Sequence, residues 1–190
     1  MNILEFSEAL ARKIERTPRG SSLSSEAEFE KAHVVGPAWE LSRQHPEVRV
    51  FTHPWRRNVR CKPTCDAGAS DFALRVEGCP DCWAASKAPT AVAAFGTRSN
   101  FDLAALDRRG RTLVVEVKWL TLSSGKGPNS EFQRFIGQCT LAAAVNDVVI
   151  GVCGFHGQGR THFDVHSANV RRTLRKIGVH LVCLPGNGGE

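Results

Sequence analysis

The stretch FDLAALDRRGRTLVVEVKW, residues 101–119, decides the fold of this chain. Its two apolar, β-favouring runs, 101–107 and 111–119, are separated by two arginines and Gly110. A three-residue hairpin loop commonly ends in a residue with positive φ, a conformation that glycine adopts at little cost. The sequence therefore predicts a β-hairpin over this stretch.

The hairpin loop also sets which residues face each other across the two strands. It pairs Asp107 with Arg111, and counting back along both strands places Asp102 opposite Glu116. Side chains alternate along a strand, so Asp102 and Glu116 share one face with Lys118. The alternate residues of the second strand form an apolar face that we expect to cover a core: Leu113, Val115, Val117 and Trp119.

Two carboxylates that oppose each other across a hairpin repel, and a cation between them removes the repulsion. Oxygen ligands of this kind suit Mg²⁺ or Mn²⁺. The hairpin therefore predicts a divalent metal site at Asp102 and Glu116, with Lys118 nearby to neutralise charge or hold a water. From these residues alone, the alternative is an ordinary amphipathic hairpin with a solvated Glu/Lys face.

Asp102 followed by Glu-Val-Lys at 116–118 resembles the PD-(D/E)xK nuclease superfamily, which has the restriction-endonuclease-like fold. The family has a proline before the aspartate, where this chain has Phe101, but that proline is not a metal ligand. The resemblance covers roughly residues 25–155. It implies an α/β fold with an αβββαβ core, in which a mixed central sheet is flanked by helices. The two motifs then fall on the second and third core strands.

The resemblance implies metal-dependent hydrolysis of the phosphodiester bonds of nucleic acid, with DNA favoured over RNA. Asp102, Glu116 and the backbone carbonyl of Val117 would hold Mg²⁺ or Mn²⁺. Lys118 would orient or deprotonate the attacking water, or neutralise the phosphate. Many nucleases of this kind act as dimers, so a homodimer is compatible with the resemblance.

Two further positions of the family have more than one match in this chain. A glutamine on the helix after Glu-x-Lys recurs in many branches, and Gln138 is the favoured match, with Gln133 second. It would position the lysine or the water. Many members also bring a glutamate from the first helix to the metal, and the sequence leaves Glu30 and Glu40 open.

A second motif lies between the first and second core strands, where we expect a small zinc-binding insert at about 55–98. It contains two close cysteine pairs, and such pairs with a short spacer are typical of a structural Zn²⁺ site. The four cysteines are Cys61, Cys65, Cys79 and Cys82. His53 and Asp81 are less favoured substitute ligands, and four unrelated cysteines are the alternative to a zinc site.

Composition favours a polyanionic partner, because the formal net charge is +6 and the isoelectric point is near 9.2. Basic residues in the insert, in the loop after the hairpin and on the last helix are the candidates for contact with the nucleic-acid backbone. They are Arg56, Arg57, Arg60, Lys126, Arg171 and Arg175.

No apolar run is long enough to span a membrane, so no membrane partner is expected. The first residues lack the apolar core of a signal peptide, which predicts a cytoplasmic, reducing location in which disulfides are not expected. We expect an N-terminal helix and linker at 1–24, followed by the nuclease-like domain at 25–190. The other expected elements, in chain order, are a helix at 3–16, a helix from Ser25 with a kink or restart at Pro37, a strand at 47–54, a short helix at 83–95, a helix at 131–145, a strand at 147–155, a strand at 161–165, a helix at 168–177 and a strand at 179–184.

Two other functions fit the same sequence. The chain could be a nucleic-acid-binding or assembly module that has an idle nuclease-like core and works through its zinc insert. It could also be a protein-interaction domain in which zinc only supports the fold and the net charge is incidental. Divalent metal bound between Asp102 and Glu116 would favour the nuclease.

Overall fold

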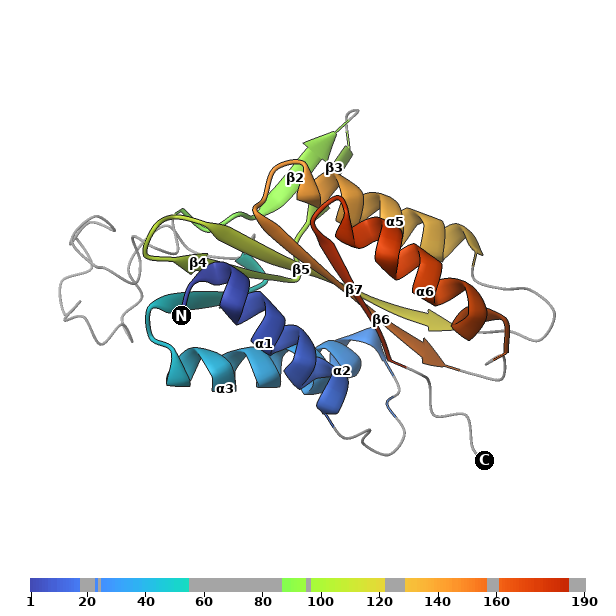
Figure 1. Cartoon of the computed structure of the whole chain (residues 1–190), viewed down its shortest axis with the longest axis horizontal. Helices are drawn as coiled ribbons and strands as arrows, with labels where there is room; N and C mark the ends of the chain where they lie inside the picture. The colour runs from blue at the N-terminus through green and yellow to red at the C-terminus, as the bar shows by residue number, and fades with distance from the viewer. Residues whose placement is uncertain are drawn as a thin grey trace.

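The computed structural model describes residues 1–17, 23, 25–54, 87–94, 97–121, 129–156 and 161–184. Its main sheet has five strands in the order β1-β4-β5-β6-β7. The pairs β1–β4 and β4–β5 are antiparallel, whereas β5–β6 and β6–β7 are parallel. The chain is therefore an α/β protein with a mixed sheet flanked by helices, as expected (Figure 1).

The strands of the main sheet are β1 (Val48–Thr52), β4 (Leu103–Asp107), β5 (Thr112–Thr121), β6 (Val148–His156) and β7 (Val179–Leu184). A separate antiparallel pair consists of β2 (Ala91–Ala94) and β3 (Thr97–Asn100). The described helices are α1 (Ile3–Arg16), α2 (Glu26–Glu30), the π-helix η1 (Lys31–Val35), α3 (Gly36–Gln44), α5 (Asn129–Ala143) and α6 (Thr161–Arg175).

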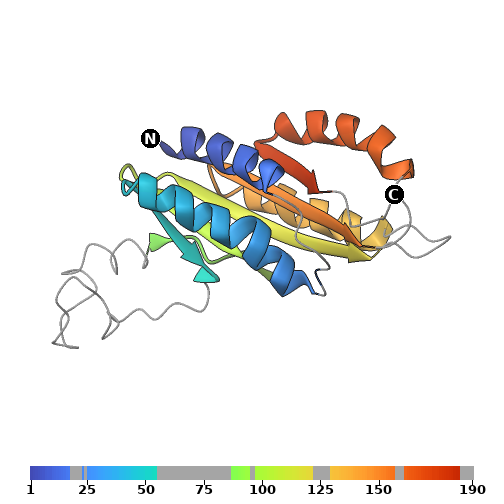
Figure 2. The same ribbon diagram turned by 90° about the horizontal axis from the view of Figure 1, so that it is seen from below.

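The sheet separates two apolar cores, because alternate side chains of each strand point to opposite faces. On one face, Leu113, Val115 and Val117 of β5 pack with α1, α2 and α3. On the other, Val114 and Leu120 pack with α5 and α6. Figure 2, turned by 90°, shows α1 beside the continuous helix formed by α2, η1 and α3 over the strands. The expected apolar face of the hairpin is confirmed.

The hairpin has the predicted register. Leu103 pairs with Val115, and the Asp107 N–H donates to the Arg111 carbonyl at 3.1 Å. Gly110 has φ +78°, the conformation that this loop requires of its last residue. Counting one residue beyond the first pair places Asp102 opposite Glu116, as the sequence predicted.

The helix that begins after Ser25 continues past Pro37 without ending. Ser25 caps it by accepting a hydrogen bond from the Glu28 N–H at 3.3 Å. The turn before the proline is a π-helix, in which the Gly36 N–H bonds to the Lys31 carbonyl. Proline cannot donate a hydrogen bond, and the wider turn lets the helix continue through it.

Two expected elements are wrong. Residues 161–165, expected as a strand, are the first residues of α6, which extends the basic helix expected at 168–177 towards its N-terminus. Within residues 83–95, expected as a short helix, Lys87 is helical, but the helix does not extend to the end of this range, because Ala91–Ala94 form β2. Pairing with β3, together with burial of Val92 against the core beneath α5, overrides the helix preference of the alanines.

Within the described parts of the chain, no helix combines the length and apolarity needed to cross a membrane.

Candidate acidic metal site

Asp102 immediately precedes β4, and its carboxylate accepts a hydrogen bond from the part of the β5 edge that β4 does not pair with. Because β4 begins at Leu103, its ladder with β5 stops at Val115. The next N–H on that edge, from Val117, donates to the Asp102 carboxylate Oδ2 at 2.8 Å. The Asp102 carbonyl in turn accepts the His53 N–H at 2.7 Å. Asp102 is therefore held by the backbone on both sides.

Glu116 is buried on the α5 face of the sheet. Only 4% of it is exposed, and its Oε1 has no hydrogen-bond partner among the described residues. Its neighbour on β6 is Gly151, where a Cβ would lie 2.8 Å from the Cys139 sulfur. The glycine thus lets α5 pack closely beside Glu116. A buried carboxylate oxygen without a partner is costly unless something else satisfies it.

Both carboxyls have strongly shifted pKa values. Burial raises the pKa of Asp102 to about 6, and the nearby Glu30 and Glu26 carboxylates add to the rise. Burial also raises the pKa of Glu116 to about 8, helped by the charge of Asp102. The pair therefore resists carrying two negative charges without a cation, which is the electrostatic situation of a metal site.

Glu30 and His53 complete a cluster around Asp102. One ligand atom from each of the three residues lies within 4.8 Å of the other two. His53 Nε2 is 3.5 Å from Glu30 Oε2, and Glu30 is only 8% exposed. His53 also has φ +45°, a sparsely populated conformation for a residue with a side chain. Such backbone strain often occurs at functional sites.

The packing of α2 against the sheet places Glu30. The ring of Phe29 lies 4.8 Å from that of Trp119 on β5. A Cβ at Gly154 on β6 would lie 2.6 Å from the Phe29 ring, so the glycine permits this close approach. The sheet and helix are thereby held together directly beside Glu30.

Lys118 lies on the same strand as Glu116 and forms an ion pair with α2. Its Nζ donates to Glu26 Oε2 at 2.9 Å. The same oxygen accepts the Trp119 N–H at 3.0 Å. Lys118 is thus held at the edge of β5 on which Asp102 also lies.

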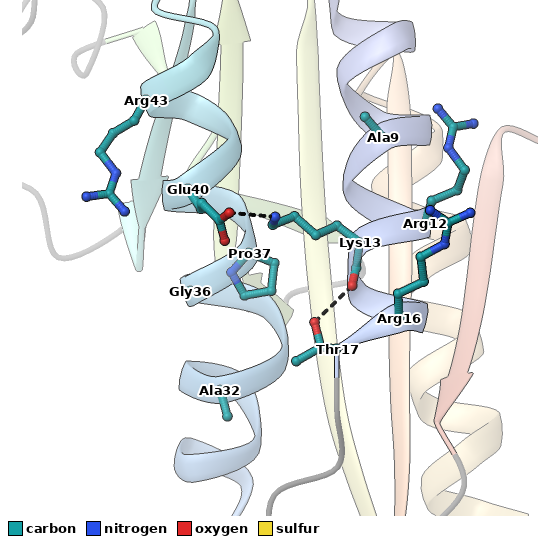
Figure 3. A pocket seen from close by; sticks show the side chains of 10 residues that line it. All are labelled: Ala9, Arg12, Lys13, Arg16, Thr17, Ala32, Gly36, Pro37, Glu40 and Arg43. Atoms are coloured by element: carbon teal, nitrogen blue, oxygen red, sulfur yellow. Dashed lines mark hydrogen bonds and ion pairs between the residues drawn. The ribbon is translucent and has the colours of Figure 1, made fainter.

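The structure distinguishes between the two glutamates that the sequence left open. Glu30 joins the acidic cluster, whereas Glu40 forms an ion pair with Lys13 at 2.9 Å. That pair bridges a groove of about 690 Å³ between α1 and α3, lined by Arg12, Arg16 and Arg43 among others (Figure 3). Neither Asp102 nor Glu116 lines this groove.

The other expected site residues are dispersed or not described. Gln138 on α5 donates to the Ser99 hydroxyl of β3 at 3.0 Å, and Gln133 is exposed on the same helix. Arg171 and Arg175 lie on α6, which packs against β7, three strands away from β4. The four cysteines of the zinc motif and the other basic candidates lie outside the described residues: Cys61, Cys65, Cys79, Cys82, Arg56, Arg57, Arg60 and Lys126.

Sequence reasoning missed His53 and Glu26 at this site. The position of His53 follows from topology, because the end of β1 meets the start of β4 when the two strands pair antiparallel. An expected β1–β4 pair could therefore have indicated His53. Glu26 gives no such signal, since an acidic residue in the first turn is common in any helix.

Comparisons of this chain with models of known protein families, with curated proteins and with solved structures find no match.

Proposed function

We propose that this protein is a metal-dependent nuclease of the PD-(D/E)xK kind, which hydrolyses phosphodiester bonds in nucleic acid, with DNA as the favoured substrate. The observation that carries the proposal is the acidic pair of half-buried Asp102 and buried Glu116. The two carboxylates oppose each other at the end of a hairpin, and Glu30 and His53 lie close to Asp102.

The donor set fits a hard divalent cation. Carboxylate oxygens from Asp102, Glu30 and Glu116 suit Mg²⁺ or Mn²⁺, and the imidazole of His53 favours Mn²⁺ among the two. In a β-strand, the N–H and the carbonyl of one residue point towards the same edge of the strand. The Val117 carbonyl is therefore directed to the edge of β5 at which the Val117 N–H donates to Asp102. The Glu116 oxygen without a partner gives the cation an acceptor that the described residues leave unsatisfied.

A bound divalent ion would supply Lewis-acid stabilisation of charge on the phosphoryl oxygens and lower the pKa of water. The residues of the chain provide a fixed carboxylate and a positive charge. Asp102, held by two backbone hydrogen bonds, keeps its carboxylate in a fixed place. Lys118 brings a positive charge to the same edge of β5, where it would neutralise the phosphate or orient the attacking water.

The order of elements also supports the proposal. The helix of α2, η1 and α3 is followed by β1, β4, β5, α5 and β6, which gives αβββαβ when the β2–β3 pair is set aside. Asp102 precedes the second strand of the main sheet, and Glu116 and Lys118 lie on the third. These are the strands on which the superfamily carries its motif. A zinc-binding insert at 55–98 remains part of the proposal.

A cleavage assay on end-labelled single-stranded and duplex DNA and RNA, in Mg²⁺, Mn²⁺ or EDTA, tests the function and identifies the substrate. We expect cleavage that requires the metal and is lost in Glu116→Gln. Glu40→Gln is the matched control, because it removes a helical carboxylate remote from the cluster and should leave cleavage unchanged. Nucleic-acid binding without cleavage of any substrate would instead favour the idle-core binding module.

A further inference from the structure

One turn of α2 supplies two carboxylates to the same edge of the sheet. Glu26 and Glu30 are four residues apart in the helix, so they lie on one face. Glu30 approaches Asp102, and Glu26 contacts Lys118. The helix that brings a ligand to the proposed metal site therefore also brings a partner to the proposed catalytic lysine.

Glu26 accepts a hydrogen bond from the Trp119 N–H, as Asp102 does from the Val117 N–H. Val117 and Trp119 both lie on β5 beyond the end of its ladder with β4. The carboxylate of Glu26 is thus anchored by the backbone of the strand. The Lys118 ammonium binds the same oxygen, Oε2, so its position is set by the anchored carboxylate.

Stability does not explain this arrangement. The two side chains are partly exposed, with 32% of Lys118 and 46% of Glu26 accessible to solvent. Ion pairs with this exposure contribute little to folding. The lysine side chain is long and flexible. Because the ion pair already holds the ammonium in one place, less conformational entropy is lost when substrate binds. What the contact provides is therefore a fixed position for the Lys118 ammonium.

We propose that Glu26 is a positioning residue for the reaction, which holds the Lys118 ammonium at the metal-facing edge of β5, ready to contact the scissile phosphate or the attacking water. This inference rests on the proposed nuclease function. It assigns Glu26 no contact with the metal, in contrast to Glu30 one turn away.

The test compares Glu26→Ala and Glu26→Gln with the wild-type chain by steady-state cleavage of end-labelled DNA in Mn²⁺. Glu28→Gln is the control, because it removes a carboxylate from the same short helix. We expect kcat to fall roughly 10- to 100-fold in Glu26→Ala, as for other residues that orient catalytic groups, with KM unchanged. Mn²⁺ affinity, measured by calorimetry, should remain that of wild type and would show that the cluster is intact.

A double-mutant cycle with Lys118→Ala separates positioning from a structural role. If Glu26 acts through Lys118, removing Glu26 from the Lys118→Ala chain should cause no further loss of kcat. Additive losses, or an unchanged or raised kcat in both Glu26 variants while Asp102→Ala is inactive, would overturn the inference and leave the nuclease function standing. A wild-type chain that cleaves none of the substrates would overturn both.

Discussion

The Asp102 carboxylate accepts the Val117 N–H at 2.8 Å, at the edge of β5 where the ladder with β4 has already ended. This contact brings the carboxylate beside the buried Glu116, which precedes Val117 in the strand. The backbone hydrogen bond lowers the pKa of Asp102, but burial and neighbouring carboxylates outweigh it. The site is thus built with unfavourable electrostatics that a cation would relieve.

Glu116→Gln should raise the stability of the metal-free protein at alkaline pH. Burial raises the pKa of Glu116 from 4.5 to about 8, so the folded state binds more protons than the unfolded state between these values. The free energy of unfolding of wild type therefore falls as the pH rises through this window. We expect Gln to gain on the order of 4 kcal/mol at pH 8 and about 1 kcal/mol or less at pH 5. Urea unfolding in EDTA measures this, and a wild type equally stable at both pH values would refute it.

Glu30→Gln and His53→Ala should each weaken Mn²⁺ binding while leaving the fold intact, because both side chains lie at the acidic cluster. We expect a loss in affinity of roughly tenfold or more, equivalent to about 1.4 kcal/mol. Isothermal titration calorimetry measures it. Glu40→Gln should bind like wild type, since Glu40 pairs with Lys13 instead. Equal affinity in all the variants would remove Glu30 and His53 from the site.

Affinity for Mn²⁺ should also increase with pH. The raised pKa values of Asp102 and Glu116, about 6 and about 8, mean that protons compete with the metal in this range. Titrations at pH 6 and pH 8 in buffers of different ionisation enthalpy should show tighter binding at pH 8 and proton release on binding. Affinity that does not change with pH would contradict the proposed ligands.

Gly154→Ala should destabilise the protein, because a Cβ there would lie 2.6 Å from the Phe29 ring and 2.7 Å from that of Trp119. Overpacking of this kind costs about 1–3 kcal/mol. Gly137→Ala on α5 is the matched control. A Cβ there meets nothing within 4 Å, so the change should stabilise the helix by about 0.5–1 kcal/mol. Thermal unfolding of both variants tests the pair, and equal effects would contradict the packing described around Phe29.

Asp107→Ala should destabilise the hairpin by about 2 kcal/mol or more, since charged hydrogen bonds are strong. The carboxylate accepts N–H groups from Arg109 and Arg111 at 2.9 and 3.0 Å and forms an ion pair with the Arg111 guanidinium at 2.7 Å. Burial alone would raise its pKa, but these bonds lower it. Its contribution should therefore be present at neutral pH and be lost as the pH falls through the lowered pKa. Chemical unfolding at neutral and acid pH measures both effects.

The hairpin could be predicted from sequence because its determinants are local. Gly110 specifies the loop, the loop specifies the register, and the register places Asp102 opposite Glu116. The choice between Glu30 and Glu40 could not be made in this way. Both lie on the same helical segment, and only the packing of Phe29 against β5 and β6 decides which one faces Asp102.

The start of α6 shows where local pattern misleads. Phe163 and Val165 alternate with polar residues, which is typical of a strand. Phe163, Val170 and Leu174 also recur at helical spacing, and the last two pack into the core beneath α5 and α6. The helical period places Val170 and Leu174 on the side of α6 that packs against the core.

The most direct test of the central claim is DNA cleavage by wild type and by Asp102→Ala, with folding of both checked by circular dichroism. Cleavage by wild type in Mn²⁺ or Mg²⁺ that stops on adding EDTA and is absent in the folded variant is the predicted result. Equal cleavage by wild type and the variant, or cleavage that persists in EDTA, would contradict the claim that the cluster around Asp102 is the active site.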